Sequence, residues 1–254
     1  MLLVLDIGNT NISVGVYDED LVIQARFSST ERTADEAGLL LEGLLRSKNV
    51  PLNAIDGAIL CCVVPNLEVA WRGAVKEYFG FDPLTVSHKL DLGIKIDVDF
   101  PGEVGADRLA NAVGAAAKYG APVIAVDLGT AINIDAVSRD GSYIGGAIAP
   151  GLMTSVGTLF SRTAKLPQVA LEAPPRAIGR NTINAIQSGI IYGYAGLVDE
   201  LTRRILNELG QDAAVVATGG HADTLAAESN MIKTVDHWLT LDGLRVIYKR
   251  NSKR

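Results

Sequence analysis

The chain has 254 residues, of which 48% are hydrophobic and 20% are charged, as in a folded globular protein with one large domain or two smaller ones. Its formal net charge of -6 at pH 7 argues against non-specific attraction to nucleic acid or to an anionic membrane surface. The sequence has no apolar run of about 18 residues that would span a membrane, and no basic segment precedes its short N-terminal apolar stretch. We therefore expect a cytoplasmic protein that contacts neither nucleic acid nor membrane.

The first half of the sequence predicts three strands followed by alternating helices and strands. The first two apolar runs are joined by the turn GNTN, and the third run follows the polar turn YDED. Leucines at helical spacing, and a second amphipathic pattern that ends at a glycine, predict two helices. The predicted strands cover residues 2–6, 12–17, 21–28, 57–64 and 84–88, and the predicted helices cover residues 35–49 and 66–80.

Two adjacent cysteines, Cys61 and Cys62, lie in the apolar run AILCCVV. Neighbouring cysteines rarely have the geometry to bridge each other, and a metal site would need more ligands. We interpret both as reduced thiols in a buried strand.

The second half of the sequence opens with a copy of the first turn. Residues 121–137, APVIAVDLGTAINIDAV, again run from an apolar strand through Asp, one further residue and Gly into a second strand. Asp127 matches Asp6, and Gly129 matches Gly8. Two such turns, about half a chain apart and each heading a similar order of elements, predict two related α/β lobes.

We expect these lobes to cover residues 1–118 and 119–254. An alanine-rich helix, with Glu103 and Asp107 in its first turn, closes the first lobe, and the glycine-rich stretch 142–151 follows the second hairpin. The segment AAVVATGGHADTL then predicts a strand, a glycine turn and a helix. Further helices are predicted over residues 152–162, 181–210 and 237–251, with Asn181 or Thr182 as the cap of the middle one.

The two aspartate turns suit the phosphates of a nucleotide. Small residues in a tight turn point several backbone N–H groups into one concavity, and such concavities bind phosphate. A carboxylate just before the turn would repel the phosphate unless a cation lies between them, and Mg²⁺ binds through one or two carboxylates together with water and substrate phosphates. The two turns that contain Asp6 and Asp127 are therefore predicted to bind the phosphates of one nucleotide from two sides. Each turn alone is better explained as a plain hairpin, and only their pairing favours phosphate binding.

A third glycine turn, ATGG at residues 217–220, follows a short apolar strand and opens a helix. Gly219 and Gly220 allow close approach of a flat ligand, and a helix N-terminus favours a phosphate or hydroxyl group. We predict an adenosine pocket here, with a plain strand-to-helix turn as the alternative. The sequence has neither a Walker P-loop nor a GxGxxG fingerprint.

Phosphoryl transfer to a hydroxyl needs one group that accepts the hydroxyl proton. His88 and His237 lie outside the motifs and are expected at the surface or in structural roles, and His221 could only flank the nucleotide. Asp107 is the better candidate, because the helix N-terminus and Arg108 favour an ionised carboxylate there. The alternative is a helix-start acid that is merely paired with its neighbour.

Taken together, these residues resemble the type III pantothenate kinases, bacterial members of the actin-like ATPase and sugar kinase superfamily. The resemblance runs in order over essentially the whole chain, through LDIGNTN, EVGADRLANAVGA, AVDLGTA, GGAIAPG, RTAKLPQV, IGRNTINAIQSGIIYG, ATGG and LDGLRVIYKRN. The turn motifs are shared across the superfamily, whereas GADR and the TAKLP, GRNT and SG series are much more specific. The implied fold is two actin-like (ribonuclease H-like) lobes, each a mixed sheet flanked by helices.

The resemblance also implies ATP-dependent phosphorylation of pantothenate, the first step of coenzyme A synthesis, by a homodimer. It implies Asp107 as the proton acceptor, Asp6 beside Mg²⁺ and the ATP phosphates, and Asp127 at a monovalent cation, K⁺ or NH₄⁺. Together with the turns above, it places ATP contacts on Gly8, Asn9, Thr10, Asn11, Gly129, Thr130, Gly219 and Gly220, and pantothenate contacts on Gly105, Ala106, Asp107, Arg108 and Thr182.

One stretch departs from the family pattern. Ahead of EVGADR the family commonly has tyrosine and then Asp-Asn-Pro, whereas here Val98 occupies the place of the tyrosine. Because Val98 brings no hydroxyl, we expect a looser or drier pantothenate pocket on that side, with Phe100 as a substitute aromatic wall.

Two functions of other kinds compete with this interpretation. A regulatory or binding protein could keep the fold without turnover, but it would not need Asp6, Asp107 and Asp127 together. A different small-molecule kinase, such as a sugar or acetate kinase, is compatible with the fold alone. GADR together with GRNT favours pantothenate.

Overall fold

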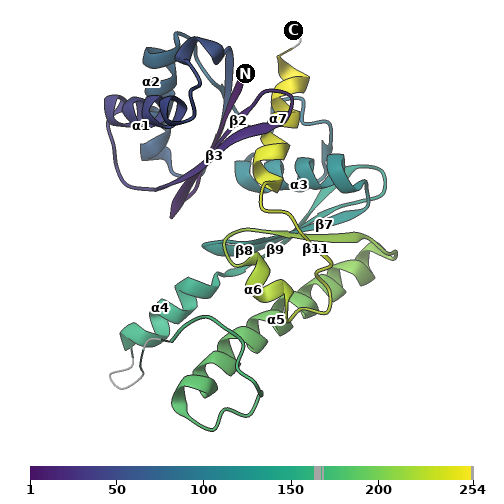
Figure 1. The fold of residues 1–254 in the computed structure, drawn as a ribbon. Helices are drawn as coiled ribbons and strands as arrows, with labels where there is room; N and C mark the ends of the chain where they lie inside the picture. Colours follow the sequence, from purple (N-terminus) through teal and green to yellow (C-terminus); the bar gives the residue numbers. More distant parts are fainter. Residues whose placement is uncertain (163–166, 168, 253–254) are drawn as a thin grey trace. The chain divides into compact units, whose positions relative to one another are not determined.

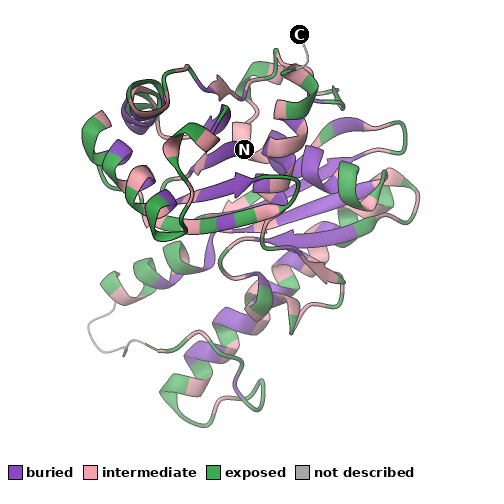
Figure 2. Cartoon of the chain, turned by 45° about the horizontal axis from the view of Figure 1, so that its top comes forward, coloured by how far each residue is buried: buried purple, intermediate pink, exposed green. Residues whose placement is uncertain are grey.

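The computed structural model describes residues 1–162, 167 and 169–252, which form two compact units (Figure 1). Most of the RTAKLPQV motif lies outside the described residues. Each unit contains one sheet whose inner strands are largely buried and whose outer strands are more exposed, and the helices that flank it are buried along one side (Figure 2). Unit 1 comprises Met1–Lys95, Asp99–Ala117 and Leu239–Arg254, and unit 2 comprises Ile96–Val98 and Lys118–Trp238.

Unit 1 is built on a five-stranded mixed sheet with the order β3-β2-β1-β4-β5. The first three strands are antiparallel neighbours, and β4 and β5 extend the sheet in parallel with β1. Its strands are β1 (Leu2–Ile7), β2 (Asn11–Tyr17), β3 (Leu21–Ser28), β4 (Gly57–Cys62) and β5 (Leu84–Thr85), and its α-helices are α1 (Ala34–Ser47), α2 (Pro65–Phe79), α3 (Ala106–Tyr119) and α7 (Leu239–Asn251), with short 3-10 turns at Leu52–Ala54 and Pro101–Glu103.

The two faces of this sheet carry different elements. Leu3, Leu5 and Ile7 of β1 share a buried cluster with residues of α1 and α2, so these helices cover one face. Side chains alternate along a strand, so Asp6 points to the opposite face. On that face α7 contacts β1, and a Cβ on Gly15, which is paired with Val4, would lie 3.1 Å from Leu241 Cδ1.

The structure differs from the expected lobe boundaries at the C-terminus, because α7 belongs to unit 1 rather than to the second lobe. Glycines let α3 and α7 approach closely (Figure 1): a Cβ on Gly243 would lie 1.9 Å from Ala110 O. The Thr240 hydroxyl also donates a hydrogen bond to Asn111 Oδ1 at 2.7 Å. The final helix therefore returns to the first unit through packing that the linear order does not reveal.

Unit 2 repeats the strand arrangement of unit 1 in a sheet with the order β11-β10-β7-β8-β9-β6. Strands β7 and β8 form the antiparallel hairpin that matches β1 and β2, and β10 lies parallel to β7 as β4 lies to β1. Its strands are β7 (Val123–Leu128), β8 (Ala131–Val137), β9 (Ser142–Pro150), β10 (Ala214–Thr218) and β11 (Thr234–Val235), with β6 (Lys95–Ile96) at the edge, and its helices are α4 (Leu152–Arg162), α5 (Thr182–Leu209) and α6 (Ala222–Ala226).

The predicted repeat is therefore confirmed at the level of strand pairing. Asp6 precedes the last residue of its strand and pairs with Ser13, and Asp127 occupies the same place opposite Asn133.

Within the described part of the chain, no helix is long and apolar enough to cross a membrane.

Candidate active site

The first aspartate turn is fixed by hydrogen bonds from two sides. Gly8 N donates to Asn11 O at 3.0 Å and closes the loop between β1 and β2. Ser29, just after β3, donates from its hydroxyl to Gly8 O at 2.6 Å and from its backbone N–H to Thr10 O at 3.0 Å. Asn9, Thr10 and Asn11 themselves are exposed. The turn is therefore a solvent-accessible loop whose backbone is held by hydrogen bonds, and it is suited to binding phosphate.

Asp6 lies in a row of polar residues that crosses the first sheet. The strand registers place Arg26, Ser13, Asp6 and Cys61 side by side on β3, β2, β1 and β4. The Cys61 thiol donates a hydrogen bond to Asp6 Oδ1 at 3.1 Å. Burial raises the pKa of Asp6 from 3.8 to about 6, while the Cys61 hydrogen bond and the charge of Arg26 act in the opposite direction.

Asp107 stands in the first turn of α3, in the GADR motif. Its Oδ1 accepts a hydrogen bond from Arg108 N at 2.8 Å. A Cβ on Gly105 would lie 2.5 Å from the same oxygen, so a side chain there would displace the Asp107 carboxylate from this position. The negative charge of Asp107 contributes to the raised pKa of Asp6 and of Cys61. The fold of unit 1 thus brings Asp6 and Asp107, which are far apart in sequence, into one electrostatic environment.

The second aspartate turn, in unit 2, is one residue shorter than the first. Gly129 N donates to Ala131 O at 3.1 Å. The Thr154 hydroxyl of α4 donates to Thr130 O at 3.0 Å, and Gly151 packs against the same carbonyl, where a Cβ would lie 2.2 Å away. Helix α4 therefore holds this turn, and Thr130 itself is exposed.

The ATGG turn meets the second aspartate turn. Gly219 has a φ of +97°, and a Cβ there would lie 2.7 Å from Asp127 Oδ1, so only glycine suits this position. His221 N donates to Leu128 O at 3.2 Å. Burial lowers the pKa of His221, which keeps the imidazole neutral at pH 7. Gly220 is exposed and has open space where a side chain would stand. Asp127 and the third turn thus form one cluster in unit 2.

The remaining predicted substrate residues lie in both units. Ala106 begins α3 in unit 1, next to Gly105 and Asp107. Thr182 is the exposed first residue of α5 in unit 2, and Asn181, not Thr182, is its cap, since Asn181 Oδ1 accepts from Asn184 N at 2.8 Å.

The segment around Val98 and Phe100 is more exposed to solvent than an aromatic wall of a substrate pocket would be. Val98 is half-buried, with its Cγ1 3.7 Å from the place of a Cβ on Gly145, whereas the Phe100 side chain is 66% exposed.

The donor set of the first turn fits a magnesium ion carried by a nucleotide. Among the described residues, no group of three or more His, Cys, Asp or Glu side chains forms a protein cage for a metal. Mg²⁺ usually binds proteins through one or two carboxylates and keeps water and phosphate oxygens as its other ligands. Asp6, partly exposed at the end of β1, is a suitable single carboxylate.

Sequence reasoning missed two contacts of this site. Ser29 holds the backbone of the first turn, and Cys61 touches Asp6, although the sequence predicts only that both cysteines fill a buried strand. Both cysteines are free thiols in β4, and Cys61 is buried as predicted, whereas Cys62 at the end of the strand is only partly buried. The signal for the Cys61 contact is the parallel register of β1 and β4, which the sequence does not reveal.

Comparison with solved structures gives the fold class of the protein. A protein from Campylobacter jejuni described as a Baf family transcriptional activator aligns with a TM-score of 0.60 and 21% identity over 99% of this chain and 100% of its own. The inorganic polyphosphate/ATP-glucomannokinase of an Arthrobacter species aligns with a TM-score of 0.53 and 14% identity, over 100% and 99% of the two chains. At these identities the likeness concerns the fold alone, which is that of the actin-like ATPases and sugar kinases.

Sequence comparison then gives the family. The family model for type III pantothenate kinase matches residues 2–204. A type III pantothenate kinase of Roseiflexus sp. (strain RS-1) is 49% identical over 253 residues, which is 99% of each chain. The chain therefore belongs to the type III pantothenate kinase family, and it is a kinase that uses ATP to phosphorylate an alcohol group of pantothenate for coenzyme A synthesis.

Proposed function

We propose that the enzyme transfers the γ-phosphoryl group of ATP directly, in line, to the terminal hydroxyl of pantothenate, with Asp107 as the proton acceptor. This proposal is supported by the electrostatic coupling of two carboxylates in unit 1, because the charge of Asp107 raises the pKa of Asp6 and of Cys61. In this proposal Asp6 acts at the phosphates of ATP, and Asp107 accepts the proton of the pantothenate hydroxyl.

The other residues bind and orient the substrates. Mg²⁺, when bound, would neutralise charge on the phosphates, and Asp6 would hold it while the backbone of the first turn holds the phosphate oxygens. The proposed ATP contacts are Gly8, Asn9, Thr10, Asn11, Gly129, Thr130, Gly219 and Gly220, and the proposed pantothenate contacts are Gly105, Ala106, Asp107, Arg108 and Thr182. The hydrogen bonds that hold the two turns support this proposal, because positioning supplies most of the catalysis of phosphoryl transfer.

Asp127 is the proposed ligand of a monovalent cation, K⁺ or NH₄⁺. Its carboxylate lies against glycine backbones at Gly129 and Gly219, where added Cβ atoms would approach Oδ1 to 3.2 and 2.7 Å. A charged oxygen among backbone groups, with side chains kept away, is chemically suited to a weakly hydrated cation.

Steady-state ATP turnover tests the function. With Mg²⁺ present, we expect ADP formation that depends on pantothenate and is much faster in potassium than in sodium buffer. Asp127→Asn should lose most of the stimulation by potassium, because the amide carries no charge, while the matched control Asp212→Asn, an exposed acid of unit 2, should keep it. A folded protein that binds ATP but shows no pantothenate-dependent turnover in either buffer would contradict the proposal.

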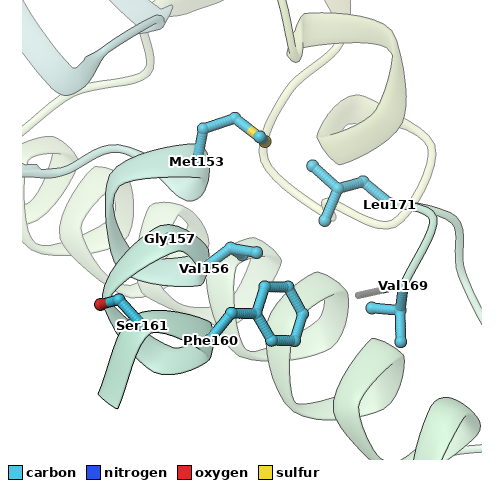
Figure 3. A pocket seen from close by; sticks show the side chains of 7 residues that line it. All are labelled: Met153, Val156, Gly157, Phe160, Ser161, Val169 and Leu171. Carbon is cyan, nitrogen blue, oxygen red and sulfur yellow. The ribbon is translucent and has the colours of Figure 1, made fainter. Parts of the chain in front are cut away.

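A homodimer is also proposed, and unit 2 has an apolar surface that supports it. Side chains of α4 and the segment after it enclose a cavity of about 410 Å³ (Figure 3). Met153 is 54% exposed at its rim, and Ile178 and Ile183 are exposed in the same unit. Apolar surface of this kind commonly marks an interface between subunits. The cavity is lined by Met153, Val156, Gly157, Phe160, Ser161, Val169 and Leu171.

Sedimentation velocity tests the dimer and this surface together. We expect a species of twice the 26.8 kDa chain mass, and Met153→Asp should shift it toward monomer because a carboxylate would be buried without a partner. Val69→Asp, at an exposed apolar position of α2 in unit 1, is the matched control and should leave the mass unchanged. A Met153→Asp protein that stays fully dimeric would place the interface elsewhere.

A further inference from the structure

Cys61 is an unusual neighbour for a carboxylate at a phosphate site. It lies directly beside Asp6 in the parallel pairing of β1 and β4, and its side chain is fully buried. Its Sγ is 3.1 Å from Asp6 Oδ1, and a protonated thiol donates in this contact. No other hydrogen bond to the Asp6 side chain occurs within the described residues. The thiol therefore restrains one carboxylate oxygen and leaves Oδ2 available to a ligand.

The second unit has a donor at the same place. There Thr218 of β10 pairs with Asp127, as Cys61 of β4 pairs with Asp6. Thr218 is also buried, with 2% of its surface exposed. Both parallel neighbours of the turn aspartates are thus small side chains with one S–H or O–H donor. A strand that only fills an apolar core would need no hydrogen-bond donor at either position. Because a donor occurs beside the turn aspartate in both units, we relate it to the aspartate.

We infer that Cys61 is a positioning residue of the phosphate site, whose thiol fixes the Asp6 carboxylate so that Asp6 binds the cation carried by ATP. This inference rests on the proposed role of Asp6. It assigns no chemistry to Cys61 itself. The neighbouring Cys62 is excluded from this role, because its thiol donates to Val64 O at 3.1 Å, at the start of α2.

ATP binding with and without magnesium tests the inference independently of turnover. In Cys61→Ala, we expect the affinity for Mg²⁺–ATP to fall about two- to tenfold, the effect of one lost hydrogen bond, while the affinity for ATP in excess chelator stays the same. Cys61→Ser should recover most of the Mg²⁺–ATP affinity, because the hydroxyl also donates. Cys62→Ala is the matched control and should bind like the unmodified protein. In turnover assays Cys61→Ala should raise the KM for ATP and leave the KM for pantothenate unchanged.

A double-mutant cycle separates positioning from packing. If Cys61 acts through Asp6, Cys61→Ala should cause no further loss of Mg²⁺–ATP affinity in an Asp6→Asn protein. An equal loss in both backgrounds, or a Cys61→Ser protein as weak as Cys61→Ala, would overturn the inference and leave Cys61 as a packing residue. Failure of pantothenate-dependent turnover in the unmodified protein would instead contradict the proposed function, and the binding cycle would still decide the role of Cys61.

Discussion

Asp107→Asn is expected to lower kcat by about 10²–10⁴-fold, the range for loss of a general base, with little change in the Kd of ATP or of pantothenate. The amide has the same shape, and its Oδ1 can still accept the hydrogen bond that Arg108 N donates at 2.8 Å. The start of α3 should therefore keep its structure. What the variant loses is the capacity to take the proton from the attacking hydroxyl.

The measurement is a comparison of single-turnover rates with calorimetric binding constants, which separates chemistry from binding. Glu103→Gln is the matched control, since Glu103 is an exposed acid four residues earlier in the same segment. It should retain full kcat. If Asp107→Asn kept a substantial part of kcat, Asp107 would orient the hydroxyl without accepting its proton. If Asp107→Asn also lost the binding of pantothenate, the main role of Asp107 would be to bind the substrate in the ground state.

The hairpin of each unit could be predicted from the sequence because its determinants are local. Apolar runs, a glycine turn and an aspartate at the strand end define the hairpin of β1 with β2 and that of β7 with β8. The same sequence pattern occurs in both hairpins, so the repeat is visible as well. The one-residue difference in turn length is also visible, since Leu128 pairs with Ile132 where Ile7 pairs with Ile12. The amino-acid sequence alone is therefore sufficient to locate the two candidate phosphate turns.

Features that depend on distant partners could not be predicted. The glycine-rich stretch after the second hairpin forms strand β9, because Gly146 lies so close to β8 that a Cβ would meet Ile134 O at 1.8 Å. The strand expected at 84–88 forms only over Leu84–Thr85, where β4 offers a parallel partner. The contact of Cys61 with Asp6 depends likewise on strand register, which links residues 55 positions apart.

Asp6→Asn should abolish most activity and at the same time stabilise the protein at neutral and alkaline pH. For activity, loss of the carboxylate that faces the phosphate-bound cation should lower kcat/KM for ATP by about 10²-fold or more, as for loss of one key electrostatic contact. For stability, burial raises the pKa of Asp6 from 3.8 to about 6, so the folded state holds the ionised carboxylate less well than the unfolded chain does.

The sign of the pH dependence follows from this raised pKa. Well below pH 3.8 Asp6 is protonated in both states and costs nothing. The cost grows between pH 3.8 and about 6, where the unfolded chain has lost the proton that the folded state still holds, and it is fully present above pH 6. The full shift corresponds to about 3 kcal/mol, and we expect about 1–2 kcal/mol because Asp6 keeps some solvent contact. Urea unfolding should therefore show Asp6→Asn to be more stable than the unmodified protein at pH 8 and equal to it near pH 4. Asp20→Asn, at an exposed acid between β2 and β3, should change stability at neither pH. If Asp6→Asn were instead less stable than the unmodified protein at pH 8, the ionised carboxylate would have favourable partners in the folded state. The idea that the site keeps this charge at a cost in stability, in order to bind ATP, would then be wrong.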